Sequence, residues 1–189
     1  LLTAVNADVL GQRDLAEIER ISWEAEDGQE IEGWIAYPPD FDPEGSYPLI
    51  LEIHGGPHTA YGPIFSAEVQ LMAAAGYVVL YTNPRGSTSY GEDFANEIDK
   101  AYPGGDATDL LLGVDAVVAR GFIDEERLFV TGGSGGGVLT AWLIGIDDRF
   151  AAAAVGKPVI NWTSFALAAD IGPWILTYWM DGTPWDNPD

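Results

Sequence analysis

Apolar positions change their spacing near residue 48, and the two patterns predict different elements. Before this point, two segments rich in β-branched and aromatic residues flank Asp27-Gly28, a dipeptide typical of tight hairpin turns. An antiparallel pair of strands is therefore expected at 18–25 and 30–37. After this point, short and nearly continuous apolar runs indicate strands that are buried on both faces. These runs lie at 49–53, 77–81, 128–131 and 151–155.

Helix-like stretches alternate with these apolar runs. In the second stretch Leu110, Val114 and Val117 recur at helical spacing, and Asp106 near its start suits the positive end of a helix dipole. The stretches lie at 65–75, 107–119 and 138–145. Strands that alternate with helices imply right-handed crossovers and a mostly parallel sheet. We therefore expect one α/β domain with helices on both faces of the sheet.

The charge balance narrows the range of partners. Thirty acidic residues against eight basic ones give a formal net charge of −22. Such a surface repels phosphate groups, so neither nucleic acid nor an anionic membrane is an expected partner. The longest apolar run, 71–81, is shorter than the roughly 20 residues that span a bilayer. The chain has no cysteine, which excludes disulfides and thiolate metal sites. This leaves the compartment open, and we expect a soluble protein that is either cytoplasmic or periplasmic.

The strand expected at 128–131 leads into Gly-Gly-Ser-Gly-Gly at 132–136, a G-x-S-x-G element that a helix-like segment follows. In that context a sharp turn lifts the serine hydroxyl clear of the sheet, and the glycines avoid Cβ clashes. Ser134 is therefore the candidate nucleophile, and the next backbone N–H, that of Gly135, is placed to meet a developing oxyanion. The alternative is a phosphate-binding loop, but the lysine of a Walker loop would fall on Val138.

A second glycine loop follows the strand expected at 49–53. His-Gly-Gly-Pro-His at 54–58 has the form with which many α/β-hydrolases supply the other oxyanion donor. His54 and His58 are the only histidines. The triad order of this fold is serine, acid and then histidine, and no histidine follows Ser134. We therefore expect His54 to order its loop and His58 to lie at the surface or a pocket edge, with no metal site.

Four stretches, which together span nearly the whole chain from position 18, make a specific combination. They are 49–57 (LILEIHGGP), 82–91 (TNPRGSTSYG), Gly105-Asp106 with Asp109 through 121–124 and Arg127 into 132–134, and 182–185 (GTPW). This combination resembles the catalytic domain of the prolyl oligopeptidase family, closest to its acylaminoacyl-peptidase and dipeptidyl-peptidase-like branch. The resemblance implies an α/β-hydrolase fold and a serine peptidase that cleaves oligopeptides, without a cofactor.

The resemblance also assigns roles to individual positions. It implies Ser134 as the nucleophile and the backbone N–H groups of Gly135 and Gly56 as oxyanion donors. It places Trp162 in a wall of the substrate pocket and suggests further aromatic residues as lining. The alternative is that these aromatic residues belong to the ordinary hydrophobic core. These further lining candidates are Trp174, Tyr178 and Trp179. One departure is Gly135 itself, because this branch usually has tyrosine after the nucleophile.

The family pattern also sets expectations for domains. Residues 1–20 resemble a connector from an N-terminal β-propeller, so 21–189 is expected to be the N-terminal part of the hydrolase domain, incomplete at its C-terminus. The triad aspartate and histidine are expected beyond Asp189. Serine without an adjacent base is a weak nucleophile, so the chain alone is expected to be nearly inert. Its expected partners are a peptide substrate, the propeller and the C-terminal segment.

Two other classes of function stay open. An esterase or lipase can use the same fold, although the 82–91 stretch favours the peptidase. A non-catalytic binding or regulatory module that has lost its base is the third interpretation. The preferred side chain, endo- or exo-action and homo-oligomer formation are not determined by the residues.

Overall fold

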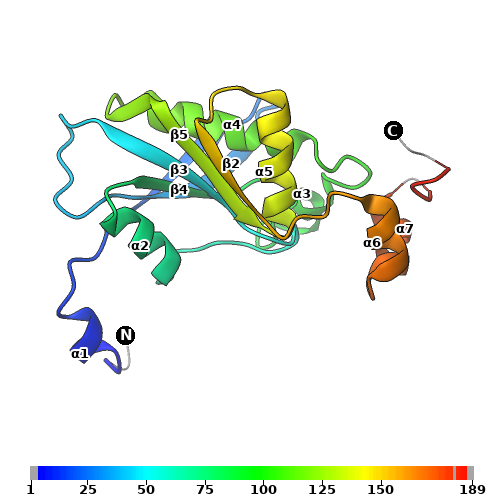
Figure 1. The fold of residues 1–189 in the computed structure, drawn as a ribbon, viewed down its shortest axis with the longest axis horizontal. Coiled ribbons are helices and arrows are strands. Elements are labelled where there is room, and N and C mark those ends of the chain that lie inside the picture. Colours follow the sequence, from blue (N-terminus) through cyan, green and yellow to red (C-terminus); the bar gives the residue numbers. More distant parts are fainter. Residues whose placement is uncertain (1–3, 181, 187–189) are drawn as a thin grey trace.

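The computed structural model describes residues 4–180 and 182–186. Its strands form one mixed sheet in the order β1-β2-β4-β3-β5-β6 (Figure 1). The neighbouring pairs β4/β3, β3/β5 and β5/β6 are parallel, whereas β2 pairs antiparallel with both β1 and β4. The bounds are β1 (Ile18–Glu24), β2 (Glu30–Ala36), β3 (Tyr47–Ile53), β4 (Val78–Asn83), β5 (Ile123–Gly133) and β6 (Ala152–Gly156). The predicted hairpin and the mostly parallel sheet are both confirmed.

Helices cover both faces of this sheet. Helices α4 and α5 contact each other and pack on one face, and α2 packs on the other (Figure 1). The bounds are α1 (Ala7–Leu10), α2 (Ala67–Ala74), α3 (Glu92–Asn96), α4 (Gly105–Val118), α5 (Gly135–Ile146), α6 (Trp162–Ala168) and α7 (Gly172–Tyr178). In the described part of the chain, no helix is both long and apolar enough to cross a membrane.

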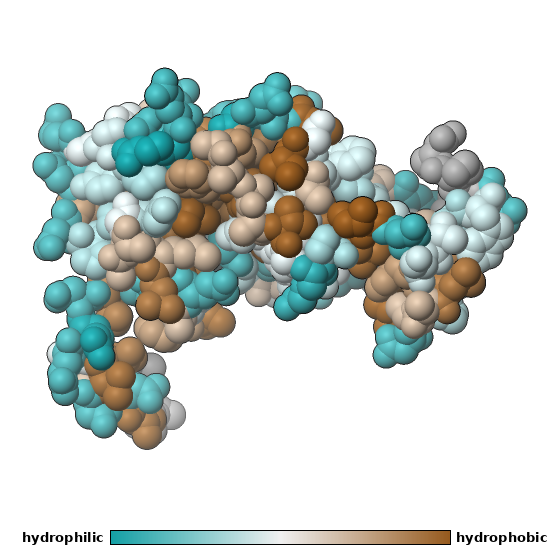
Figure 2. Space-filling model, in the orientation of Figure 1, coloured by the Kyte–Doolittle hydropathy of each residue, from teal (hydrophilic) through white to brown (hydrophobic). Residues whose placement is uncertain are grey.

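The sheet separates two apolar layers. On the α4 face, Leu110 and Val114 are fully buried against strand residues such as Leu51. On the α2 face, Trp34 and Tyr81 stack with ring centroids 5.6 Å apart. Burying apolar area stabilises by roughly 25 cal/mol per Å², so these layers carry the fold. By contrast, α1 and the α6–α7 pair carry exposed apolar side chains, which account for brown areas at the two ends of Figure 2.

Element boundaries differ from the sequence predictions where packing overrides pattern. Helix α2 begins at Ala67 because the Ser66 hydroxyl oxygen accepts a hydrogen bond from the N–H of Val69 and caps the helix. Helix α5 begins at Gly135, three residues before the predicted start. The sheet already begins at Ile18, inside the segment expected to be a connector, and the Tyr37 N–H donates to the Glu17 carbonyl.

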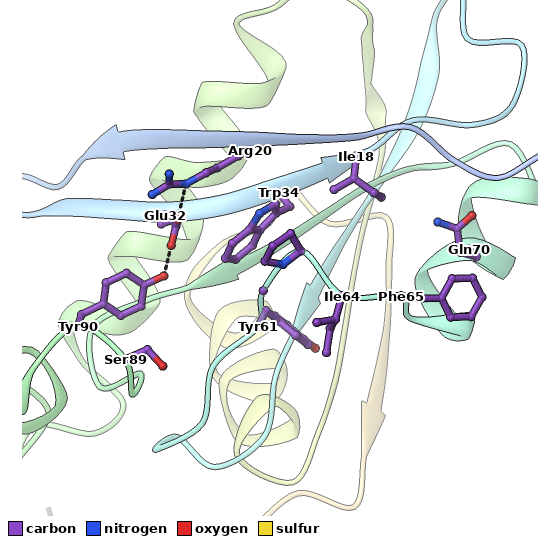
Figure 3. A pocket seen from close by; sticks show the side chains of 12 residues that line it. Ile18, Arg20, Glu32, Trp34, Tyr61, Ile64, Phe65, Gln70, Ser89 and Tyr90 are labelled. Atoms are coloured by element: carbon purple, nitrogen blue, oxygen red, sulfur yellow. Dashed lines mark hydrogen bonds and ion pairs between the residues drawn. The ribbon is translucent and has the colours of Figure 1, made fainter. Parts of the chain in front are cut away.

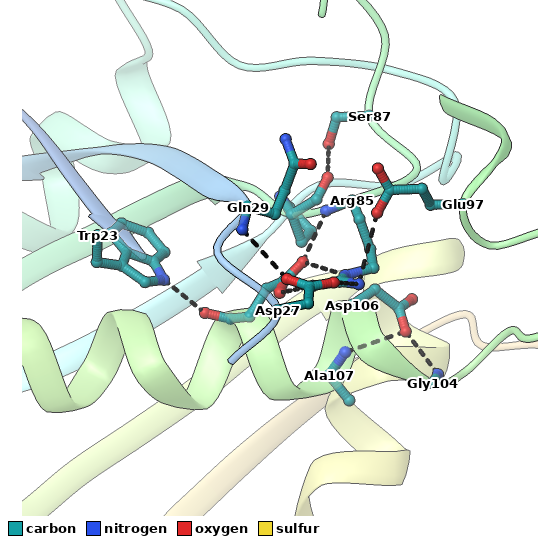
Figure 4. A network of polar contacts seen from close by, with 11 residues as sticks. Trp23, Asp27, Gln29, Arg85, Ser87, Glu97, Gly104, Asp106 and Ala107 are labelled. Atoms are coloured by element: carbon teal, nitrogen blue, oxygen red, sulfur yellow. Dashed lines mark hydrogen bonds and ion pairs between the residues drawn. The ribbon is translucent and has the colours of Figure 1, made fainter. Parts of the chain in front are cut away.

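Arg85 ties the loop after β4 to its surroundings. Its guanidinium donates to both oxygens of Asp109 at 2.9 Å, and to Asp27 in the hairpin turn at 2.8 Å (Figure 4). The Arg85 backbone N–H also donates to Asp109, whose carboxylate is fully buried. Bidentate pairs of this kind are strong and directional. They hold the 84–87 loop against α4, close to the histidine loop described below.

Candidate active site

Ser134 lies alone between β5 and α5. Its backbone has φ +59° and ψ −118°, a conformation that costs a non-glycine residue on the order of 1–3 kcal/mol. Its N–H donates to the Gly156 carbonyl at the end of β6 over 2.9 Å. The side chain is exposed. The structure therefore has the tight strand-to-helix turn that the sequence predicts, with Ser134 at its apex.

On the inner side of this turn, the backbone of the glycine run packs directly against the backbone of β3 and β6. A Cβ added to Gly136 would lie 2.1 Å from the carbonyl oxygen of Ile53. One added to Gly137 would lie 2.4 Å from the Gly156 oxygen. Only glycine fits such approaches, because Cβ atoms essentially never come closer than 3.0 Å. The glycine run thus lets α5 start directly after the serine, although glycine is a poor helix former.

The loop that follows β3 lies directly against Ser134. Strands β3 and β5 are parallel neighbours with Ile53 opposite Gly132, so both loops leave the same edge of the sheet. A Cβ on Gly55 would lie 3.4 Å from the Cβ of Ser134, and one on Gly135 would lie 2.8 Å from the Gly56 oxygen. Among the described residues, no backbone carbonyl accepts a hydrogen bond from the N–H of Gly56 or Gly135. The two predicted donors are therefore brought together and are uncommitted.

His54 is buried and engaged by its own surroundings. Its Nδ1 lies 2.7 Å from the Gly55 carbonyl oxygen, and its Nε2 lies 3.0 Å from the Ser87 hydroxyl. Burial lowers the pKa of His54, while the contact with Gly55 acts in the opposite direction. Both ring nitrogens therefore have a protein partner, and the Ser87 hydroxyl itself donates to the Pro84 carbonyl at 2.6 Å. His54 thus orders the glycine loop, in line with the sequence-based interpretation.

His58 sits at the rim of an aromatic cluster. Its Nδ1–H donates to the Gly86 carbonyl at 3.0 Å, and its ring meets the edges of Trp179 and Trp174 at centroid distances of 5.4 and 6.4 Å. Neither histidine hydrogen-bonds to Ser134 within the described residues. In the described part of the chain, the candidate nucleophile is therefore not hydrogen-bonded to a histidine.

Tyr102 connects the aromatic cluster to the turn. Its hydroxyl donates to the Gly135 carbonyl over 2.9 Å. Burial, reinforced by the nearby Asp106, raises the pKa of Tyr102, so the hydroxyl keeps its proton. Its ring lies 5.6 Å from that of Trp179 and 6.5 Å from that of Trp162. Sequence reasoning missed Tyr102, because nothing in the spacing along the chain relates it to Gly135.

A hollow of about 620 Å³ adjoins this cluster. Its aromatic lining comes from Tyr102, Trp142, Trp162 and Trp179, so two of the four predicted pocket residues line it. Trp174 and Tyr178 contact each other instead, with ring centroids 5.4 Å apart and ring planes at 36°, and the two residues are 44% and 57% exposed. Tyr178 is therefore not part of this lining, and Trp174 contacts the site through His58.

A second hollow, of about 590 Å³, lies against β1 and β2 and contains none of the predicted site residues (Figure 3). Arg20, Glu32 and Tyr90 form a linked polar wall on one side, and Ile64 and Phe65 supply apolar surface on another. It has no contact with Ser134 that would connect it to the chemistry of the turn. The hollow next to Tyr102 is the one that belongs to the candidate site.

The mostly parallel sheet and the turn between β5 and α5 are those of the α/β-hydrolase fold, as solved structures of similar chains also show. Within this class the chain belongs to the prolyl oligopeptidase family, whose model matches residues 63–189. Both the fold and the family that the sequence suggests are thereby confirmed.

Three similar proteins illustrate the relationship. The chain is 42% identical over 180 residues to a Bacillus subtilis protein named "Uncharacterized peptidase YuxL", covering 95% of this chain and 27% of that one. It is 41% identical over 128 residues to the acylamino-acid-releasing enzyme of Arabidopsis thaliana, covering 67% and 17%. The solved acylaminoacyl peptidase of Pyrococcus horikoshii superposes with a TM-score of 0.92 at 32% identity, covering 98% and 30%. The chain thus spans less than a third of each relative.

Proposed function

We propose that this chain forms part of the catalytic domain of a serine peptidase of the acylaminoacyl-peptidase or dipeptidyl-peptidase type. The observation that carries the proposal is the exposed Ser134, held at positive φ beside the Gly55–Gly56 loop. Strain of this kind persists only where surrounding packing maintains it, and it gathers at functional sites. The names of the similar proteins support cleavage of peptides over cleavage of other acyl compounds.

In the proposed reaction, the Ser134 oxygen attacks the carbonyl carbon of the scissile peptide bond while a base takes the hydroxyl proton. The N–H groups of Gly135 and Gly56 then stabilise the oxyanion of the tetrahedral intermediate. Losing one such donor typically costs about 3 kcal/mol of transition-state stabilisation. The C–N bond breaks as the base returns its proton to the leaving amine, and water releases the acyl group from the serine by the same steps in reverse.

We propose that the base and its acid come from a segment beyond Asp189 in a longer polypeptide. Both histidines of this chain are engaged elsewhere, and the relatives are more than three times as long as the matched part. Residues 1–20 would then be the connector from a preceding domain, and 21–189 the first part of the hydrolase domain. The hollow beside Tyr102 would hold the side chain on the acyl side of the scissile bond.

The test uses a fluorophosphonate probe, which labels only activated serines, on the longer protein and on the 189-residue chain. We expect the longer protein to label rapidly and the chain alone hardly at all. Ser134→Ala should abolish labelling and reduce peptide hydrolysis by a factor of about 10³ or more. Ser89→Ala is the matched control, because Ser89 is also an exposed serine at positive φ (82°).

Matched substrates distinguish the remaining functions. Acetyl-alanine, dipeptidyl and simple ester derivatives of one chromogenic leaving group are compared by kcat/KM. Preference for either peptide derivative supports the peptidase, whereas turnover of the ester alone supports an esterase. Rapid labelling that survives Ser134→Ala would contradict the proposed nucleophile, and no labelling of the longer protein would favour a non-catalytic module.

A further inference from the structure

Lys157 lies beside the candidate nucleophile on the side opposite the glycine loop. It directly follows β6, whose last residue, Gly156, is opposite Gly133 in the parallel register and accepts the Ser134 N–H. Its side chain folds back over β5, so that Nζ lies 3.8 Å and Cε 3.5 Å from where a Cβ on Gly133 would be. The ammonium group is thus held next to the residue that precedes Ser134.

The backbone at Lys157 is unusual. Its φ is +41°, in the left-handed region that residues other than glycine, asparagine and aspartate rarely adopt. Glycine would remove this cost, yet the chain carries a long cationic side chain here. A strained residue beside a candidate nucleophile motivates a functional explanation for the side chain.

Lys157 is also uncommitted in a strongly acidic protein. The chain has eight basic residues against thirty acidic ones, and five of its arginines form ion pairs. Within the described residues, Lys157 makes no ion pair and no hydrogen bond, and its side chain is exposed. An ammonium group that has no partner in the described part of the chain, at the carboxyl edge of the sheet, can pair with an anionic group of a ligand.

The neighbours of β5 assign the sides of the site. Strand β3 brings the Gly55–Gly56 loop to one side of β5, and β6 brings Lys157 to the other. The aromatic hollow takes Trp162 from the segment that follows Lys157, but Lys157 itself is not among its lining residues. A substrate whose acyl side chain fills the hollow therefore meets Lys157 with a group outside the hollow, such as its leaving group.

We propose that Lys157 determines specificity by pairing with a carboxylate on the leaving-group side of a short peptide. The inference rests on the proposed function for its orientation of the substrate. The carboxylate can come from the peptide's own C-terminus or from an aspartate or glutamate side chain close after the scissile bond. Pairing with a compact ammonium group is the chemistry that both share.

The test measures binding rather than turnover, on a Ser134→Ala background that prevents cleavage. Isothermal titration calorimetry compares acetyl-Phe-Gly-Gly with its C-terminal amide, and acetyl-Phe-Asp-Gly-amide with its asparagine counterpart. Where the carboxylate of an acidic peptide pairs with Lys157, we expect that peptide to bind about fivefold more tightly than its neutral counterpart. A factor of this size is the scale of a partly exposed ion pair. Lys157→Gln should remove the difference, and Lys157→Arg should retain it.

Arg13→Gln is the control, because it removes one positive charge from the segment between α1 and β1, which is not part of the turn around Ser134. It should leave the difference between acid and amide unchanged. Raising the salt concentration should shrink the difference in the parent Ser134→Ala protein, a readout that needs no change at Lys157. Lys157→Asn, which tolerates positive φ, serves if the glutamine variant does not fold.

Equal binding of every acid and its neutral partner to the Ser134→Ala protein would overturn the proposal. So would a Lys157→Gln variant that weakens both members of a pair equally. A gain for the terminal acid alone, or for the aspartate peptide as well, supports it and identifies the source of the carboxylate. If the difference persists but the unmutated protein cleaves no peptide, the proposed function fails and the anion-binding role of Lys157 stands.

Discussion

At the scale of single residues, the turn around Ser134 depends on glycines, because there is no room for a Cβ atom at several of its positions. Gly136 and Gly145 belong to the same helix, but only Gly136 lies against foreign backbone. The Ile53 oxygen, 2.1 Å from its added Cβ, belongs to the neighbouring strand and cannot rotate away. The strain stored at Ser134 is maintained by these contacts.

The first residue-scale prediction compares two alanine substitutions in α5. Gly136→Ala should lower the free energy of unfolding by about 3 kcal/mol, the upper range for overpacking, because β3 and α5 must separate. Gly145→Ala should raise it by up to about 1 kcal/mol, because Gly145 is exposed, has nothing within 4 Å of its added Cβ and gains helix propensity. Urea denaturation followed by circular dichroism measures both. Similar effects at the two positions would contradict the packing argument.

At the scale of elements, the start of α4 carries a buried carboxyl group whose hydrogen bonding is incomplete among the described residues. Asp106 is fully buried, and one of its oxygens accepts from the N–H groups of Gly104 and Ala107, at 2.6 and 3.0 Å. The other oxygen has no partner among the described residues. Burial raises the pKa of Asp106 to about 6, and Asp109 adds to this while the backbone hydrogen bonds oppose it.

The raised pKa gives the fold a dependence on pH with a defined sign. The folded state holds the proton more tightly than the unfolded state, whose pKa is near 3.8. The stabilisation by this group is therefore complete below pH 3.8 and is lost as the pH rises toward 6. One pKa unit corresponds to about 1.4 kcal/mol, so the loss amounts to about 3 kcal/mol.

Asp106→Asn should remove this dependence. The free energy of unfolding of the variant, relative to that of the parent, should rise by roughly 2 kcal/mol between pH 4 and pH 7, because part of the effect falls outside this range. Urea denaturation at several pH values measures the difference, and the comparison cancels the titration of groups common to both proteins. Asp99→Asn, at an exposed position before α4, is the control and should leave the slope unchanged. A variant that tracks the parent at every pH would refute the assignment.

The elements also separate what the sequence could predict from what it could not. The buried strands and α4 were predictable, because burial on both faces or on one helical stripe leaves a pattern in consecutive residues. Ser134 and the glycine loop were predictable, because the turn demands particular residue types at particular spacings. The start of α5 was not, since tertiary contacts with Ile53 override the low helix propensity of glycine. Tyr102 and Lys157 reach the turn only through the fold, so no local signal points to them.

At the scale of the whole molecule, the surplus of acidic residues acts on the fold itself. A formal net charge of −22 on 189 residues makes the surface repel itself, and the unfolded chain relieves that repulsion by expanding. Isolated ion pairs such as Arg120–Glu19 are exposed and contribute little in return. Dissolved salt screens the repulsion over distances of about 10 Å at 0.1 M.

The thermal midpoint should therefore rise with salt. Between about 20 mM and 500 mM sodium chloride at pH 7 we expect an increase of several degrees, measured by circular dichroism. The same comparison near pH 4.1, where the protein carries almost no net charge, should show little change. A midpoint that falls with salt at pH 7 would mean that attractive pairs outweigh the repulsion.

The bare backbone contacts around Ser134 also limit how the gene can vary. Glycine codons share their first two bases, so changes at the third base are silent. Every change that replaces glycine by another amino acid adds a side chain. At Gly132, Gly136 and Gly137 its first atom would fall 2.5 Å or less from a main-chain oxygen. Natural populations should therefore carry only silent changes at these three codons, whereas the codon for Gly145 is free to drift.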